Sequence, residues 1–200
     1  TAHLAAFLHR QGMKVITQKP IQTGCIGMAD DLLEHRRVMG INLLPEDLDG
    51  TTCSYLLRMP ASPHLASQEE NTIIDPDRIT AHTQLLKKKY SHILIEGAGG
   101  LMVPLTSELL TIDYIKQNNY PLILVSSSKL GSINHTLLSL ESCLSRNINI
   151  HTLFYNRFAN HDQRMADDTL QVIKQYIKNL SPHTKVIEYR EPFDLTEWEE

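Results

Sequence analysis

The sequence lacks the features that mark membrane, secreted and nucleic-acid-binding proteins. No apolar run approaches the roughly 20 residues that span a bilayer, and no basic segment precedes an apolar one at the N-terminus as in a signal peptide. The 19 Lys and Arg residues are outnumbered by 23 Asp and Glu, and the net charge of −4 provides no basic surface. We therefore expect no nucleic-acid partner and no membrane association.

Cysteine is also scarce, with Cys25, Cys53 and Cys143 widely spaced and none in a CxxC motif. Disulfide frameworks and zinc sites need paired or closely spaced cysteines. The ten histidines form no HExxH motif and no carboxylate-backed pair at i, i+4. We predict a cytoplasmic protein with reduced thiols, folded as a single domain over residues 1–200.

Five short apolar runs predict strands. Most of them do not alternate apolar and polar residues, which is typical of strands covered on both faces in a parallel sheet. The predicted strands are Lys14–Thr17, His92–Ile95, Pro121–Ser126, Ile150–Tyr155 and Lys185–Tyr189.

Apolar residues at helical spacing lie between these strands. The first predicted helix follows Thr1, which could cap it, and ends at Gly12. Two others run through Ile133, Leu137, Leu140 and Leu144 and through Met165, Thr169, Val172, Tyr176 and Leu180. The alternation predicts an α/β fold with a mostly parallel, doubly wound sheet, whose ligands bind beyond the carboxyl ends of the strands.

The first predicted strand runs into the sequence KPIQTG, residues 19–24. Lys19 is a compact cation suited to phosphate or carboxylate, although for the KP pair alone a solvated surface lysine before a turn is the commoner explanation. Asp30 and Asp31 then open a helical stretch, where acidic residues are commonly partners of the helix dipole alone.

The second strand ends in HILIEGAGG, residues 92–100. A carboxylate at the end of a buried strand needs a partner, and the small residues after Glu96 leave room for a ligand against the backbone. An ordinary glycine turn is the alternative. The third strand leads through SSSKLGSIN into a helix, where Ser132 is either a plain N-cap or part of an anion site.

Taken together, the motifs KPIQTG, PASPH, ILIEGAGGLMVPL, SKLGSINHTLL and FYN follow one another in an order that resembles the dethiobiotin synthetase family. The resemblance runs from about residue 1 to Asn156. It implies a homodimer with a three-layer fold of the P-loop NTPase type. It also implies an ATP-dependent cyclo-ligase of biotin biosynthesis, which converts 7,8-diaminononanoate, CO2 and MgATP to dethiobiotin through a phosphorylated carbamate.

The resemblance assigns roles to individual residues. Lys19 would be catalytic, near the carbamate and the γ-phosphate, and Asp30 and Glu96 would be the carboxylates beside Mg²⁺. The substrate-binding residues would be Thr23, Ser62 and, from the neighbouring subunit, Gly131, Ser132, Ile133 and Asn134. The nucleotide-binding residues would be Asp30, Glu96, Gly97, Ala98, Gly99, Asn156, Pro192 and Phe193.

Two departures from the family pattern leave other interpretations open. None of the nine glycines precedes a lysine, so the phosphate loop GxxxxGK[ST] is absent, and we expect it and a first strand to lie upstream of Thr1. Tyr189-Arg190-Glu191-Pro192 also replaces the usual approach to the second adenine loop. The alternatives are a non-catalytic dimeric remnant of the family and a related ATP-dependent amidoligase domain.

Overall fold

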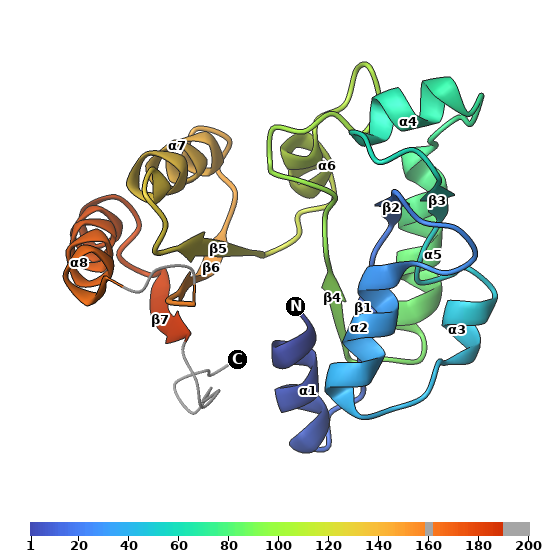
Figure 1. The fold of residues 1–200 in the computed structure, drawn as a ribbon, viewed down its shortest axis with the longest axis horizontal. Coiled ribbons are helices and arrows are strands. Elements are labelled where there is room, and N and C mark those ends of the chain that lie inside the picture. The colour runs from blue at the N-terminus through green and yellow to red at the C-terminus, as the bar shows by residue number, and fades with distance from the viewer. Residues whose placement is uncertain (159–161, 190–200) are drawn as a thin grey trace. The chain divides into compact units, whose positions relative to one another are not determined.

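The computed structural model describes residues 1–158 and 162–189. The chain divides into two compact units, Thr1–Tyr114 and Ile115–Glu200, and each is described by itself (Figure 1). Both units combine helices with parallel strands, which confirms the predicted α/β class. The single domain expected over the whole chain stays a prediction.

The first unit contains two parallel strand pairs with helices around them. Its elements are α1 (Ala2–Arg10), β1 (Val15–Gln18), β2 (Ile21–Thr23), α2 (Asp30–Met39), α3 (Pro45–Leu48), β3 (Tyr55–Leu57), α4 (Pro63–Glu69), α5 (Pro76–Lys87) and β4 (His92–Ile95), followed by α6 (Thr111–Gln117) at the boundary between the units.

Strand β1 lies at the core of this unit and is buried along its whole length. It pairs with β4, with Val15 opposite His92 and Gln18 opposite Ile95. Helices α1 and α2 pack against each other and against β1, and α5 packs against β4. The register brings the carboxyl ends of β1 and β4 to the same edge of the sheet, so the residues that follow them are neighbours.

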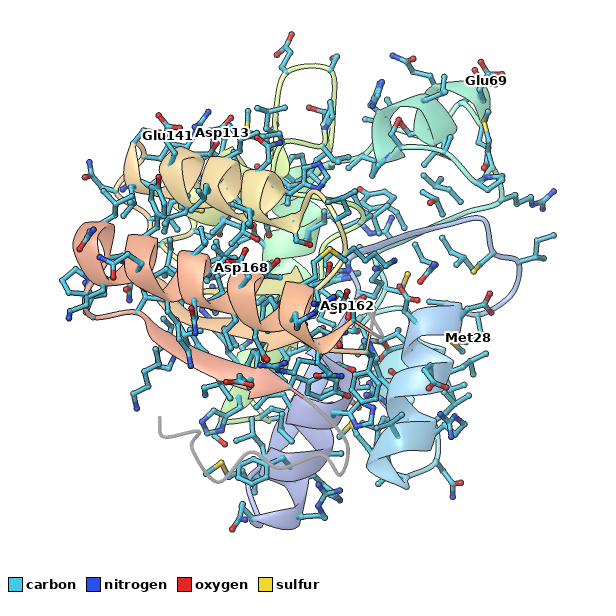
Figure 2. The ribbon with its side chains drawn as sticks, turned by 60° about the vertical axis from the view of Figure 1, so that its left-hand side comes forward. Met28, Glu69, Asp113, Glu141, Asp162 and Asp168 are labelled. Carbon is cyan, nitrogen blue, oxygen red and sulfur yellow. The ribbon has the colours of Figure 1, made fainter. Side chains whose placement is uncertain are left out.

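The second unit is built on a three-stranded parallel sheet in the order β5-β6-β7. Its strands are β5 (Leu122–Ser127), β6 (Ile150–Asn156) and β7 (Lys185–Tyr189), and its helices are α7 (Ser132–Leu144) and α8 (Gln163–Leu180). Asp162 begins α8 and accepts hydrogen bonds from the backbone N–H groups of Arg164 and Met165 (Figure 2). The Tyr155 hydroxyl donates to the backbone oxygen of Ala166 at 2.8 Å, which ties β6 to α8.

All five predicted strands are present, each within one residue of its predicted ends. Strands β2 and β3 were not predicted, because three residues are too few to show a periodicity.

The helix ends differ from the predictions in their details. Thr1 occupies the N-cap of α1, but its side chain makes no capping hydrogen bond, and the C-cap is Gln11 rather than Gly12. The N-cap of α7 is Gly131 in a left-handed conformation, so the predicted cap Ser132 is instead the first helical residue. Among the described residues, no helix has the length and apolar character needed to cross a membrane.

Candidate active site

Lys19 and Glu96 follow directly after the paired ends of β1 and β4. The Glu96 backbone N–H donates to the backbone oxygen of Gln18 at 2.8 Å. This bond extends the hydrogen-bonded pairing of β1 with β4 by one residue. The Lys19 N–H donates to the Thr52 oxygen at 2.8 Å, which fixes the start of the KPIQTG loop. The strand register therefore accounts for the closeness of Lys19 and Glu96.

The buried Lys19 ammonium contacts three acceptors. Nζ lies 2.6 Å from Asp31 Oδ2, 3.2 Å from Glu96 Oε1 and 2.9 Å from the backbone oxygen of Gly97. An ammonium group has three hydrogens to donate. Lys19 is thus fully hydrogen-bonded within the first unit, and an anionic ligand would have to replace one of these acceptors.

Glu96 is held in its ionised form. Burial alone would raise the pKa of Glu96, but hydrogen bonds from the side chains of His35 and Thr1, together with the charge of Lys19, hold that pKa well below its usual value. His35 is buried on α2, and its Nε2 lies 3.2 Å from Glu96 Oε2. The carboxylate is therefore available to a cation throughout the neutral pH range.

The carboxylates near Lys19 suit a magnesium ion that is also bound to phosphate. The described residues include no cluster of three or more His, Cys, Asp or Glu side chains that could hold a metal on its own. Mg²⁺, however, commonly takes one or two carboxylates and completes its shell with phosphate oxygens and water. Glu96 and the acidic first turn of α2 offer that donor set. Asp31 contacts Lys19, and the adjacent Asp30 is exposed.

The loop after β4 consists of small residues whose backbone lies beside Lys19 and Glu96. Gly97 and Gly99 are exposed and Ala98 is partly exposed. Gly99 has φ +84°, and a Cβ there would lie 2.9 Å from a methyl group of Val103, so only glycine fits without strain.

The β2–β3 pair brings the KPIQTG and PASPH motifs together. Gly24 has φ +77°, its N–H donates to the Met59 oxygen, and a Cβ on it would lie 3.2 Å from Pro60. Thr23, at the end of β2, and Ser62, at the N-cap of α4, are both partly exposed. Two motifs separated in sequence thus contact each other at Gly24 and Pro60.

The remaining predicted residues lie in the second unit. Gly131 has φ +90° at the entry to α7, where Gly131 and Asn134 are exposed and Ile133 is partly exposed. The Ser132 N–H donates to the Lys129 oxygen, and Ser132 Oγ lies 2.8 Å from Ser127 Oγ, so this residue is already engaged locally.

Asn156 ends β6, and its Oδ1 accepts from the Phe158 N–H at 2.9 Å. The predicted adenine contacts Pro192 and Phe193 lie outside the described residues.

Sequence reasoning missed the roles of Asp31 and His35. The signal available was their i, i+4 spacing on one predicted helix, which places both on the same face. In the structure both contact the Lys19–Glu96 pair, Asp31 through Lys19 and His35 through Glu96.

Comparison with known proteins gives concordant matches. The model of a family described as "AAA domain" matches residues 1–190. The chain is 48% identical over 184 residues to "ATP-dependent dethiobiotin synthetase BioD 2" of Pasteurella multocida, covering 92% of this chain and 86% of that protein.

Two further relatives have similar names. The protein called "ATP-dependent dethiobiotin synthetase BioD 2" in Haemophilus influenzae is 55% identical over 162 residues, covering 81% of this chain and 85% of its own length. "ATP-dependent dethiobiotin synthetase BioD" of Chlorobaculum tepidum is 52% identical over 178 residues, covering 89% of this chain and 74% of its own length.

Proposed function

Because this chain belongs to the ATP-dependent dethiobiotin synthetase family, we propose that it closes the ureido ring of dethiobiotin from 7,8-diaminononanoate, CO2 and ATP. One substrate amine captures CO2 as a carbamate, and the carbamate oxygen takes the γ-phosphoryl group of ATP to give ADP and a mixed anhydride. The second amine attacks the anhydride carbon, and inorganic phosphate leaves as the ring closes.

Lys19 is the proposed catalytic residue. Phosphoryl transfer needs positioning and charge neutralisation more than a protein nucleophile, and a buried ammonium provides both. Because its three hydrogens are donated to Asp31, Glu96 and Gly97, contact with a carbamate or phosphate oxygen requires the exchange of one acceptor. Asp31 is the acceptor best placed for this exchange, since its side chain is 38% exposed.

Asp30 and Glu96 are the proposed magnesium carboxylates. Support comes from the ionised state of Glu96 and from the exposed position of Asp30 in the first turn of α2. When bound, Mg²⁺ would neutralise charge on the phosphate oxygens. The positive charge of Lys19 and the negative charges of Asp30 and Glu96 would then lie near the carboxyl ends of β1 and β4.

The remaining assignments follow the motifs of the family. Thr23 and Ser62 would bind the diamine, the entry to α7 would bind the substrate carboxylate, and the protein would act as a cytoplasmic homodimer. The proposed nucleotide contacts are Gly97, Ala98, Gly99, Asn156, Pro192 and Phe193.

The contact of Lys19 with Glu96 at the end of paired strands is the observation that carries this function. The test is to incubate the protein expressed from its complete gene with the diamine, bicarbonate and MgATP, and to measure dethiobiotin by mass spectrometry and phosphate release together. We expect one phosphate per product, dependent on both the diamine and bicarbonate. Lys19→Ala should remain folded and lose product formation by orders of magnitude. Phosphate release that does not need the diamine would contradict the proposed reaction.

A further inference from the structure

The two oxygens of the Glu96 carboxylate have different partners. Lys19 Nζ lies 3.2 Å from Oε1, and His35 Nε2 lies 3.2 Å from Oε2. An ionised carboxylate can only accept hydrogen bonds, so the His35 ring must donate through Nε2. His35 thus fixes one oxygen and leaves the other on the side of Lys19.

We propose that His35 is a positioning residue: it holds Oε2 of Glu96 and so fixes the orientation of the carboxylate that would bind Mg²⁺. This inference rests on the proposed function, since it concerns the same carboxylate. Without the His35 contact, the Glu96 side chain could rotate and present either oxygen, or both, to the metal. Partners that orient a metal ligand in this way commonly change metal affinity by about 10- to 100-fold when they are removed.

The burial of His35 supports a positioning role over a purely structural one. The residue is only 4% exposed, and its Nδ1 has no hydrogen-bond partner among the described residues. Burying an unpartnered polar atom costs free energy, so an apolar side chain would satisfy packing better at this position. The contact with Glu96 is the only hydrogen bond of this ring that offsets the cost within the described part of the chain.

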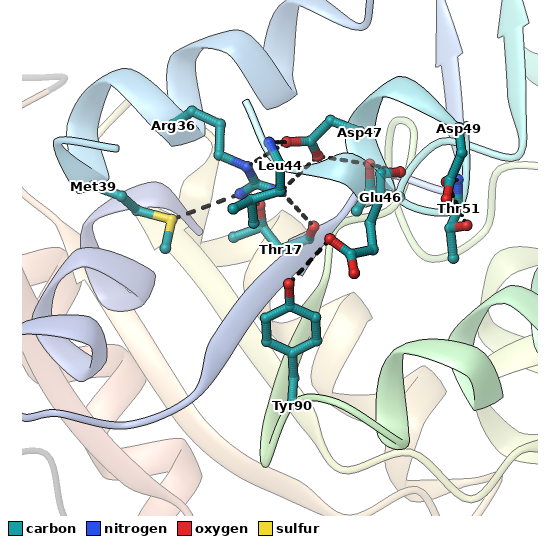
Figure 3. A network of polar contacts seen from close by, with 10 residues as sticks. Thr17, Arg36, Met39, Leu44, Glu46, Asp47, Asp49, Thr51 and Tyr90 are labelled. Carbon is teal, nitrogen blue, oxygen red and sulfur yellow. Dashed lines mark hydrogen bonds and ion pairs between the residues drawn. The ribbon is translucent and has the colours of Figure 1, made fainter. Parts of the chain in front are cut away.

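The helix that carries His35 is anchored next to it. Arg36 donates from Nε and Nη2 to the two carboxylate oxygens of Asp47, at 2.8 and 2.7 Å, and from Nη1 to Thr17 Oγ1 at 2.8 Å (Figure 3). Thr17 lies on β1, two residues before Lys19. The Arg36 network therefore ties α2 to strand β1, which leads into Lys19, and so supports the placement of the His35 ring beside Glu96.

The experiment compares His35→Leu with His35→Gln. Leucine keeps the volume and removes the donor, whereas the glutamine amide can still donate to Oε2. Mn²⁺ binding to the protein with ADP is measured by the loss of the free-ion electron paramagnetic resonance signal, alongside kcat, KM and the Mg²⁺ concentration for half-maximal turnover. We expect His35→Leu to weaken Mn²⁺ binding and to raise the Mg²⁺ requirement about 10-fold or more, with kcat at saturating Mg²⁺ changed much less. In His35→Gln, both the Mn²⁺ affinity and the Mg²⁺ requirement should return most of the way to their wild-type values.

His82→Leu is the matched control. His82 is a partly buried histidine of the same unit, and its Nδ1 lies 2.9 Å from Ser54 Oγ, so the substitution also removes a ring hydrogen bond. It should leave the Mn²⁺ affinity and the Mg²⁺ requirement unchanged. Equal metal affinities in His35→Leu, His82→Leu and the wild type would overturn the role of His35. Wild-type protein without turnover would refute the proposed reaction instead, and the Mn²⁺ comparison would still decide the positioning role.

Discussion

Lys19 shows how a single side chain links two structural elements at the proposed site. Its ammonium contacts Asp31 on α2 and both Glu96 and Gly97 in the loop after β4. If the acidic residues in the first turn of α2 served only as partners of the helix dipole, they would not need a contact with another element. Asp31, however, forms a 2.6 Å ion pair with the buried Lys19. The two neighbouring carboxylates therefore have different surroundings, since Asp31 contacts Lys19 and Asp30 is exposed.

Substitution of each carboxylate separately tests these roles. Asp30→Asn removes a proposed metal ligand, and we expect the Mg²⁺ concentration for half-maximal turnover to rise about tenfold or more, because ligand charge sets affinity in such sites. Asp31→Asn removes the Lys19 counter-ion, and should lower kcat while changing the Mg²⁺ requirement much less. Magnesium titrations of turnover measure both values. A rise in the Mg²⁺ requirement for Asp31→Asn alone would show that Asp31, and not Asp30, is the ligand.

The loop after β4 gives a second test at the residue scale. Gly99→Ala forces an L side chain into a left-handed backbone conformation, which costs about 1–2 kcal/mol, and places its Cβ 2.9 Å from Val103. We expect a lower melting temperature and a higher KM for ATP, measured by thermal unfolding and by turnover.

Gly100→Ala serves as the control for this loop. No atom lies within 4 Å of a Cβ at Gly100, and its φ is not left-handed. Its melting temperature should stay close to that of the wild type. Equal destabilisation by both substitutions would mean that the loop has no specific need for glycine at position 99.

At the scale of elements, a buried ion pair joins α2 to α3 and β1. The Asp47 carboxylate is fully buried, accepts from Arg36, and also accepts from the Leu44 N–H at 2.8 Å and from Thr52 Oγ1 at 2.8 Å (Figure 3). Burial alone would raise the pKa of Asp47, but these hydrogen bonds and the charge of Arg36 hold the pKa below its usual value.

The sign of this shift predicts how stability depends on pH. A carboxyl group whose folded pKa is depressed stabilises the fold above its unfolded pKa, and that contribution is lost as the pH falls through the folded pKa. We expect the free energy of unfolding to fall as the pH is lowered below about 4, and Asp47→Asn to flatten this acid limb. At pH 7 the variant should be less stable by about 3–5 kcal/mol, because it leaves Arg36 buried without its counter-charge.

Urea unfolding at pH 7, 5 and 3 would measure the acid limb. Asp49→Asn is a suitable control, since Asp49 is exposed and, among the described residues, accepts hydrogen bonds from the nearby Thr51 alone. It should change stability little at any of these pH values. An acid limb that is unchanged in Asp47→Asn would contradict the assignment to this ion pair.

The sequence predicts the strands better than the helix faces. The strands are short apolar runs with polar residues at or after their ends, and both properties are visible in the sequence. Their predicted burial on both faces holds for β1 but not for β4, which is half-buried along its length. The predicted apolar face of α8 is displaced by one residue: Met165 and Tyr176 are 37% and 47% exposed, and the helix instead buries Ala166 and Ile177 among others. A helix face depends on what packs against it, which the spacing of apolar residues within one helix does not specify.

The same distinction applies to the candidate site. Lys19 and Glu96 could be predicted because strand ends meet at one edge of a parallel sheet. Asp31 and His35 could not, because their contacts depend on the position of α2 against β1, and that position is fixed by long-range partners such as Asp47.

At the scale of the whole molecule, the residues proposed to bind substrate and nucleotide are distributed over the two units, each described by itself. Lys19 and Glu96 belong to the first unit, whereas the α7 entry and Asn156 belong to the second. The diamine is a long chain, so its carboxylate must be bound far from the reacting amines. The N-terminus of a 13-residue helix preceded by a left-handed glycine is well suited to a carboxylate. A homodimer in which α7 comes from the neighbouring subunit would satisfy this separation.

Mixed dimers test this shared site. Lys19→Ala inactivates the site in which that lysine reacts, and Gly131→Trp blocks the carboxylate end with a residue that cannot adopt φ +90° without strain. If each site combines Lys19 of one subunit with Gly131 of the other, refolding the two variants together in equal amounts makes half of the dimers mixed. Each mixed dimer then has one intact site, which gives about a quarter of the wild-type activity. A mixture of Lys19→Ala with the double variant Lys19→Ala/Gly131→Trp should stay inactive, since no combination restores a lysine. If the first mixture also remains at the activity of the separate variants while forming dimers, each subunit must bind the diamine on its own.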